Sequence, residues 1–142
     1  MKETILSTQD IFDGRIVHLK LHTVELPNGE QTIREVIQHQ GAAAIVAINS
    51  EREILLVKQF RIGAGIETYE IPAGLLEPDE VPVATATREL QEETGYVSDN
   101  WHKLATLTHF PTRANNRVHI YLALSAYVKT EQALDPNEDI IV

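Results

Sequence analysis

One segment with helical spacing stands in a chain whose other patterned segments all resemble strands. Pro82 suits the first turn of a helix, where no hydrogen bond needs its missing N–H, and Gly95 suits the left-handed residue that ends one. Between them Val83 and Leu90 fall on one side of a helix that advances about 100° per residue, a side suited to packing on a sheet. The spacing therefore predicts a helix over residues 82–94.

Apolar patterning elsewhere in the chain predicts strands. Asn28-Gly29 accepts the positive φ angles of a tight turn, so the strands on either side of it form a first hairpin. The predicted strands cover residues 16–26, 31–39, 42–49, 54–60, 104–109 and 118–128. A single helix among these strands indicates a mixed α+β domain.

Length and composition narrow the classes of protein. The 142 residues contain no internal repeat and no linker-like stretch, which favours one domain. The absence of cysteine excludes thiolate nucleophiles and cysteine-ligated metals and is compatible with a reducing cytosol, so we expect a cytoplasmic protein. No apolar run approaches the roughly 18 residues that cross a membrane, so we expect no membrane partner. A formal net charge of -9 makes a nucleic-acid partner unexpected, and a phosphate ligand would need local arginines or bound cations.

Three glutamates gather at the end of the predicted helix. Glu89 lies three and four positions before Glu92 and Glu93, so the carboxylates are neighbours, and each such pair costs about 0.2–0.5 kcal/mol. They also occupy the negative end of the helix dipole, where cations are favoured. The cluster therefore favours either a hard divalent cation with oxygen ligands, helped by Arg88, or a solvated acidic surface.

The stretch from Gly74 to Tyr96 matches the Nudix box, the pattern G-x5-E-x7-R-E-U-x-E-E-x-G-U in which U is a bulky apolar residue. Tyr96 fills the last apolar position with a larger, partly polar ring. Residues 42–61 and 70–73 also look like strands and the E-x-P-A-G lead-in of this family, so the chain resembles a Nudix protein over most of its length. The other pattern positions hold Gly74, Glu80, Arg88, Glu89, Leu90, Glu92, Glu93 and Gly95.

The resemblance implies a Nudix-type α/β/α sandwich with a mixed β-sheet, one box helix and an N-terminal β-hairpin extension. We expect one Nudix hydrolase domain over residues 1–142, with the hairpin in residues 1–40 and a catalytic core in residues 41–142. Related chains continue with another strand and a helix that covers the sheet, whereas this sequence stops at Val142. We therefore expect the C-terminal helix to be absent, by nature or by truncation.

Nudix proteins are mostly hydrolases of a nucleoside diphosphate linked to another group, and they use Mg²⁺ or Mn²⁺, which neutralise phosphate oxygens and activate water. By resemblance, Glu89 and Glu93 are the main metal ligands, Glu92 is a direct or water-mediated ligand, and the Ala73 carbonyl is a further one. Arg88 would hold the carboxylates in place. The structural positions of the motif would be Gly74, Glu80, Leu90 and Gly95.

Within the family, the chain is most similar to the ADP-ribose and nucleoside-diphosphate-sugar pyrophosphatases. The likeness lies in the long N-terminal hairpin, in Gln59-Phe60-Arg61 and in the run from Glu70 to Gly74. It implies that a nucleotide-diphosphate small molecule is split into a nucleoside monophosphate and a sugar phosphate. The substrate-binding candidates are Arg34, Glu35, Arg61 and Glu70, each of which could instead form an ion pair on a strand surface.

The loop from Pro111 to Arg117 departs from this subfamily, because it is short and basic and lacks the acidic residue of a P-S-P-G-like loop. Arg113, which we count among the substrate-binding candidates, and Arg117 could contact a phosphate. One alternative function is therefore a nucleoside triphosphate pyrophosphatase. The other is a Nudix-like module that binds a nucleotide without cleaving it, which the unassigned base and the short C-terminus leave open although the glutamate set argues against it.

The catalytic base is expected in the acidic C-terminal segment, since the corresponding loop of related chains supplies a carboxylate that accepts a proton from water. Glu138 is the first candidate and Glu131 the second, although both could be solvated loop residues. Trp101 and Tyr121 are predicted to be core residues and not platforms for a nucleobase.

The hairpin from Ile16 to His39 is longer than a catalytic core needs. In the resembling subfamily such strands build a homodimer. We therefore expect a symmetric homodimer of this chain.

Overall fold

The chain forms two compact units in this computed structural model, which describes residues 2–136 and 138–142. One unit comprises Met1–Gly41 and Thr108–Arg117. The other comprises Ala42–Leu107 and Val118–Val142, and it contains the whole motif segment and the C-terminal loop.

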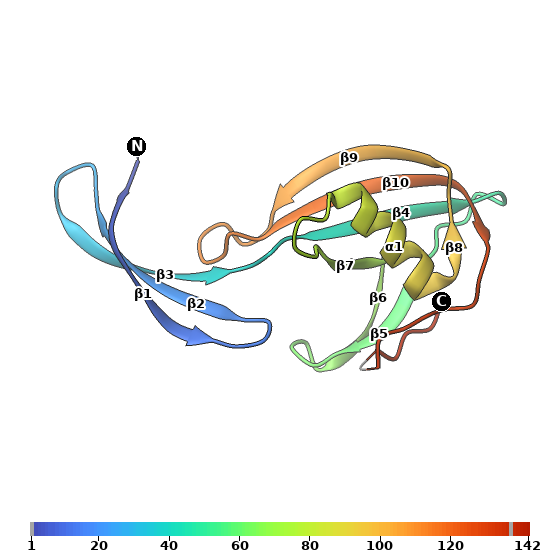
Figure 1. Ribbon diagram of the computed structural model, residues 1–142, viewed down its shortest axis with the longest axis horizontal. Coiled ribbons are helices and arrows are strands. Elements are labelled where there is room, and N and C mark those ends of the chain that lie inside the picture. Colours follow the sequence, from blue (N-terminus) through green and yellow to red (C-terminus); the bar gives the residue numbers. More distant parts are fainter. Residues whose placement is uncertain (1, 137) are drawn as a thin grey trace. The chain divides into compact units, whose positions relative to one another are not determined.

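The first unit contains an antiparallel sheet in the order β1-β2-β3 (Figure 1). Its strands are β1 (Thr4–Asp13), β2 (His18–Glu25) and β3 (Gln31–Gln38). The predicted hairpin of β2 and β3 is confirmed, and the Gly29 N–H in its turn donates to the Leu26 carbonyl at 2.9 Å. Strand β1 has no counterpart among the predicted strands, because all its residues are exposed and no buried, alternating face marks it in the sequence.

The first unit also fastens the basic loop to the end of β3. The Ile37 N–H donates to the Arg113 carbonyl at 2.7 Å. The Asn115 side chain accepts a hydrogen bond from the His39 N–H at 2.6 Å. The backbone of the loop therefore has a defined position beside β3.

The second unit is built on a mixed sheet in the order β7-β4-β10-β8, with β9 also paired to β10 (Figure 1). Strands β4 and β10 are parallel, whereas β7 pairs with β4 and β8 pairs with β10 in the antiparallel sense. Strands β5 and β6 form a separate antiparallel hairpin. The bounds are β4 (Ala42–Asn49), β5 (Val57–Arg61), β6 (Ile66–Glu70), β7 (Ala73–Leu75), β8 (Tyr96–Val97), β9 (Asn100–Thr108) and β10 (Arg117–Val128).

The strands of the central sheet agree with the predictions better than those at its margins. Strand β4 has the predicted bounds, since a continuous apolar run marks a strand buried on both faces. Strand β10, predicted from its β-branched and aromatic residues, begins one residue early. Strand β5 begins only at Val57, because Ile54 forms just an isolated bridge with Ile48. Strands β6, β7 and β8 were outside the predicted set, since short or exposed strands carry little periodicity.

Helix α1 (Pro82–Thr94) has the predicted bounds and lies across the sheet (Figure 1). Gly95 ends it at φ 74°, and the Gly95 N–H donates to the Gln91 carbonyl at 2.8 Å. Alanines on β4 and β10 let the apolar side of the helix come close to the sheet. The buried core contains Ala43, Ile45, Ala47, Leu55, Ala86, Leu90, Tyr121, Ala123 and Ala126.

These features confirm the expected fold class. The described residues contain a mixed sheet and the one helix α1, and no helix follows β10 within them. Tyr121 is buried, and Trp101 packs edge-on against it with ring centroids 6.5 Å apart, so both residues belong to the core as predicted. Among the helices described, none is long and apolar enough to cross a membrane.

Candidate metal and substrate site

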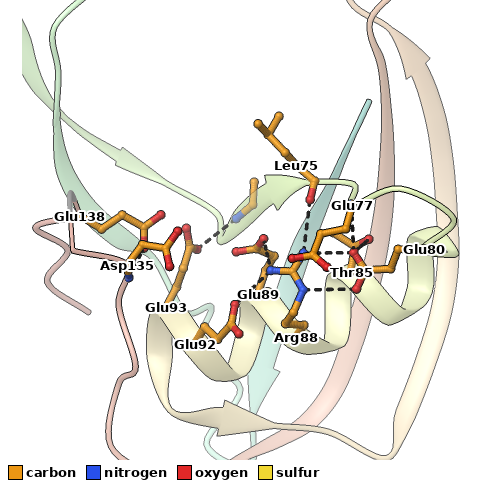
Figure 2. A network of polar contacts seen from close by, with 11 residues as sticks. Leu75, Glu77, Glu80, Thr85, Arg88, Glu89, Glu92, Glu93, Asp135 and Glu138 are labelled. Atoms are coloured by element: carbon orange, nitrogen blue, oxygen red, sulfur yellow. Dashed lines mark hydrogen bonds and ion pairs between the residues drawn. The ribbon is translucent and has the colours of Figure 1, made fainter. Parts of the chain in front are cut away.

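The C-terminal half of α1 carries glutamates of very different exposure (Figure 2). Glu89 and Glu93 are buried, at 8% and 3% exposed, while the Glu92 side chain is 42% exposed. Buried carboxylates at the negative end of a helix are unfavourable unless positive charge compensates them. A cation bound on the side of α1 that faces β7 would therefore stabilise the buried pair.

Glu93 meets the start of β7. The Ala73 N–H donates to Glu93 Oε2 at 3.1 Å and favours the ionised carboxylate. Burial outweighs this bond and raises the pKa of Glu93 to about 8, with a further increase from the charges of Glu89 and Glu138. A carboxyl that holds its proton because it is buried can release it when a metal ion binds.

The Arg88 guanidinium lies between Glu89 and Glu92 (Figure 2). Its Nη1 atom is 2.7 Å from Glu89 Oε1 and 3.0 Å from Glu92 Oε2. Burial still raises the pKa of Glu89, because desolvation exceeds the attraction of Arg88. One arginine therefore orders these two carboxylates without neutralising the buried cluster.

Strand β7 approaches Glu89 closely because residue 74 is glycine. A Cβ atom at Gly74 would lie only 1.9 Å from Glu89 Cδ. Any larger residue would push the carboxylate away from its position, so Gly74 makes the space that the Glu89 carboxylate occupies.

Glu80 holds the other side of the Arg88 guanidinium. Arg88 Nε donates to Glu80 Oε1 at 3.2 Å, and Nη2 donates to Glu80 Oε2 at 3.1 Å and to the Leu75 carbonyl at 3.3 Å. The hydroxyl of fully buried Thr85 donates to Glu80 Oε2 at 2.7 Å. These bonds lower the pKa of Glu80 to about 2, with the Arg88 bonds contributing most. Thr85 was outside the predicted site, and only its place between Glu80 and Arg88 could have indicated it.

Glu138 lies beside Glu93 near the end of α1, on the segment that follows β10 (Figure 2). The Asp135 N–H donates to Glu138 Oε2 at 3.1 Å. The charge of Glu138 raises the pKa values of both Glu89 and Glu93, so the three carboxylates influence one another. The second candidate for the base, Glu131, is exposed, and its backbone lies beside Gly95.

Arg61 and Glu70 form a two-point ion pair across the β5–β6 hairpin. Arg61 Nε and Nη2 donate to the Glu70 carboxylate at 2.9 Å and 2.7 Å, and the Thr68 hydroxyl donates to the same carboxylate at 2.5 Å. The charges of Glu93 and Glu138 contribute to the raised pKa of Arg61, so this guanidinium interacts electrostatically with the carboxylate cluster. A pocket of about 300 Å³ is lined by Lys58, Gln59, Phe60, Arg61, Glu67, Glu138, Asp139 and Ile141.

The remaining predicted substrate residues belong to the first unit. Arg34 makes a two-point ion pair with Glu3, at 2.7 Å and 3.1 Å, which raises the pKa of the guanidinium. Glu35 is exposed on β3, and Arg113 contributes its backbone carbonyl to the contact with β3. Within its own unit, Arg34 therefore forms the ion pair considered as the alternative to substrate binding.

The donor set in the second unit suits a hard divalent cation. Within residues 2–136 and 138–142, no three acidic or histidine side chains already converge as a closed metal cage. The carboxylates offer oxygen donors only, as Mg²⁺ and Mn²⁺ prefer. Burial raises the pKa values of Glu89 and Glu93, which a bound cation would oppose, and the lack of a side chain at Gly74 lets the backbone of β7 lie close to Glu89. The chemistry of these residues therefore fits such a cation.

Comparisons with known proteins agree with the motif. Residues 38–141 match the NUDIX domain, and residues 3–37 match the nucleoside diphosphate sugar hydrolase N-terminal domain. The boundary between these matches falls at the end of β3.

Two curated relatives are similar over nearly the whole chain. The methanol dehydrogenase activator of Bacillus methanolicus is 41% identical over 99% of this chain and 76% of its own length. The ADP-ribose pyrophosphatase of Bacillus subtilis (strain 168) is 40% identical over 100% of this chain and 77% of its own length.

A solved structure supports the fold. The crystal structure of an ADP compounds hydrolase superposes with a TM-score of 0.85, covering 99% of this chain and 76% of that chain. Its sequence is 23% identical, so the likeness is one of architecture.

Proposed function

The chain belongs to the Nudix hydrolase family, and we propose that it hydrolyses the diphosphate linkage of ADP-ribose or a related nucleoside diphosphate sugar. The products would be a nucleoside monophosphate and a sugar phosphate. The observation that carries this proposal is the buried pair Glu89 and Glu93, with raised pKa values, beside the carboxylate of Glu138. The name of the Bacillus subtilis relative and the matched N-terminal domain favour this substrate class.

We propose that Glu89 and Glu93 hold Mg²⁺ or Mn²⁺, with Glu92 as a direct or water-mediated ligand and the Ala73 carbonyl as a further one. A bound cation of this kind neutralises diphosphate oxygens and lowers the pKa of water. Arg88 keeps Glu89 and Glu92 in place through its bonds at 2.7 Å and 3.0 Å.

The remaining residues of the second unit would handle substrate and water. Glu138 would accept the proton of the attacking water as the bridging P–O bond breaks, since its carboxylate lies beside the cluster. Arg61, oriented by Glu70, would contact the diphosphate, because a guanidinium suits phosphate oxygens. We propose Arg34, Glu35 and Arg113, which belong to the first unit, as further substrate-binding residues.

A nucleoside triphosphate pyrophosphatase is the second candidate. The observation that favours it is the basic loop, where Arg113 and Arg117 replace the acidic loop of the nucleotide-sugar enzymes with positive charge. The third phosphate group of a nucleoside triphosphate would be attracted by these two arginines.

A product assay tests the proposal. ADP-ribose is assayed with Mg²⁺ beside a panel of nucleotide sugars and triphosphates. We expect ADP-ribose to yield AMP and ribose 5-phosphate. Glu93→Gln should lower turnover by more than about 100-fold, since changing even residues that only support metal ligands costs about 10–100-fold. Glu51→Gln, an equal loss of charge at an exposed turn, should leave turnover unchanged.

The panel separates the candidate functions. Turnover of a triphosphate in preference to any nucleotide sugar would replace the first candidate with the second. Tight nucleotide binding without metal-dependent turnover of any panel member would overturn the enzymatic proposal and favour the binding module.

We also propose a cytoplasmic homodimer that associates through the first unit. All residues of β1 are exposed, and the unit displays Ile5, Phe12 and Ile33 at 58%, 58% and 57% exposure. The strand register places Phe12 and Ile33 on one face of this sheet and Ile5 on the other, and exposed apolar side chains on a sheet face favour an interface with another chain. The cysteine-free composition is compatible with the cytoplasm.

A further inference from the structure

The segment that follows β10 is fastened to the end of α1. The Ala133 N–H donates to the Glu92 carbonyl at 2.9 Å. The N–H groups of Lys129 and Thr130 donate to the Gly95 carbonyl at 2.9 Å and 3.2 Å. Carbonyls at a helix end have no partner within the helix, so this segment satisfies acceptors that would otherwise need water.

One side chain ties both ends of this segment together. Gln132 Nε2 donates to the Glu93 carbonyl at 2.5 Å and to the Ile140 carbonyl at 3.3 Å. A carboxamide nitrogen carries two hydrogens, which is one for each of these acceptors. Ile140 is buried, and the next residue, Ile141, is bonded to Lys58 of β5 at 2.7 Å and 3.0 Å.

Glu138 lies on the stretch that this tie closes. The Glu138 N–H donates to the Asp135 carbonyl at 2.9 Å, and the Asp135 N–H donates back to Glu138 Oε2 at 3.1 Å. This local turn fixes the carboxylate relative to its own segment, and Gln132 fixes the segment relative to the end of α1. The carboxylate then lies beside Glu93 (Figure 2).

The chemistry at residue 132 calls for a neutral donor. The Glu93 carbonyl is at the negative end of the helix dipole, and the neighbouring glutamates add further negative charge. A glutamate of the same shape would have no hydrogen to donate and would be repelled by both carbonyls. The carboxamide of Gln132 supplies both bonds without adding charge.

We propose that Gln132 is a positioning residue that holds Glu138 against the carboxylates of α1 for the hydrolytic reaction. This inference rests on the proposed function, because it takes Glu138 as the group that accepts the proton of water. Gln132 acts only through Glu138 and does not itself touch the substrate.

A double-mutant cycle tests the connection between the two residues. Gln132→Ala and Gln132→Glu should each lower kcat by at least about tenfold with little change in KM, because a general base contributes about 10²–10⁴-fold to the rate. In a Glu138→Gln background, the same substitutions should cost almost nothing further, since residues that act as a unit are not additive. Gln31→Glu on β3, which makes the same change of charge, should keep the wild-type kcat.

Hydrogen exchange measured without substrate gives a second readout. Gln132→Ala should speed exchange of the Ala133 and Ile141 amides, which are bonded to the Glu92 and Lys58 carbonyls, while the Leu90 amide in α1 stays protected. If these amides exchange at the same rates in Gln132→Ala and in the wild-type protein, Gln132 does not fasten the segment to the end of α1.

The outcomes also separate this inference from the proposed function. Equal losses of kcat from Gln132→Ala in the wild-type and Glu138→Gln backgrounds would show that Gln132 does not act through Glu138. If the wild-type protein hydrolyses nothing, the proposed function fails and with it the role of Gln132 in the reaction, while the exchange data still decide whether it holds the segment.

Discussion

Among single residues, Glu93 has the environment that differs most from that of a surface glutamate. It is 3% exposed, and its pKa is raised from an ordinary value of 4.5 to about 8. Between these values the folded protein holds a proton that the unfolded chain has released. The free energy of unfolding must therefore fall as the pH rises through this window, and Glu89, whose pKa is also raised by burial, adds an effect of the same sign.

We expect the metal-free protein, kept in chelator, to lose up to about 1 kcal/mol of stability per pH unit between pH 5 and pH 8 from Glu93 alone. Glu93→Gln should remove this part of the slope. Urea unfolding at a series of pH values measures it. The lowered pKa of His39 acts in the opposite direction, but it is common to both proteins and cancels in their difference.

Acidic groups with lowered pKa values affect the free energy of unfolding in a lower pH range. Glu80, with a pKa of about 2, affects stability only as the pH falls below about 4.5, so it does not disturb the comparison. Equal slopes for the wild type and Glu93→Gln would show that Glu93 ionises normally in the folded protein.

At the scale of elements, the end of α1 connects the helix to the segment that carries Glu138. Gly95 has φ 74°, and a Cβ atom at this position would lie 2.4 Å from the Thr130 carbonyl oxygen. The glycine therefore serves two purposes, a left-handed helix end and close contact with the following segment. Neither the backbone of α1 nor that of the segment can yield easily at this point.

We expect Gly95→Ala to destabilise the protein by more than about 2 kcal/mol, because the left-handed conformation alone costs about 1–2 kcal/mol and the clash adds to it. Gly29→Ala is the matched control, since Gly29 has φ 86° but a Cβ atom there would meet nothing within 4 Å. It should show the conformational cost alone. Urea unfolding of both variants measures the difference, and equal losses would contradict the close contact at Gly95.

At the scale of the whole molecule, the first unit exposes several large apolar side chains. Its strand β1 has no buried residue, and Ile5, Phe12 and Ile33 are each more than half exposed. A small sheet needs three or more strands with a hydrophobic face, or packing against another element, to be stable. A second copy of the chain would provide such packing.

We expect sedimentation equilibrium to give twice the chain mass of 15.9 kDa. Ile33→Glu should shift the protein toward the monomer, because an unpaired charge would be buried in the interface. Leu104→Glu on β9, which is 53% exposed in the second unit, should not. A wild-type mass of one chain at micromolar concentration would contradict the homodimer.

Several features could be read from the sequence because their causes are local. Pro82 and Gly95 define α1 to the residue, a continuous apolar run defines β4, and β-branched and aromatic residues define nearly all of β10. The spacing of the glutamates identified the cluster, because residues three and four apart on a helix are neighbours whatever surrounds them.

Other features depend on contacts between distant segments, and only the tertiary structure decided them. Strand β1 forms through pairing with β2 and leaves no pattern of its own. Burial by β7 makes Glu89 and Glu93 differ from exposed Glu92, although the three are equivalent in sequence. The approach of Glu138 to Glu93 depends on bonds that span many residues, including that of Gln132 to the end of α1. Periodicity reports which side of an element is apolar, whereas these pairings arise only when the whole chain has folded.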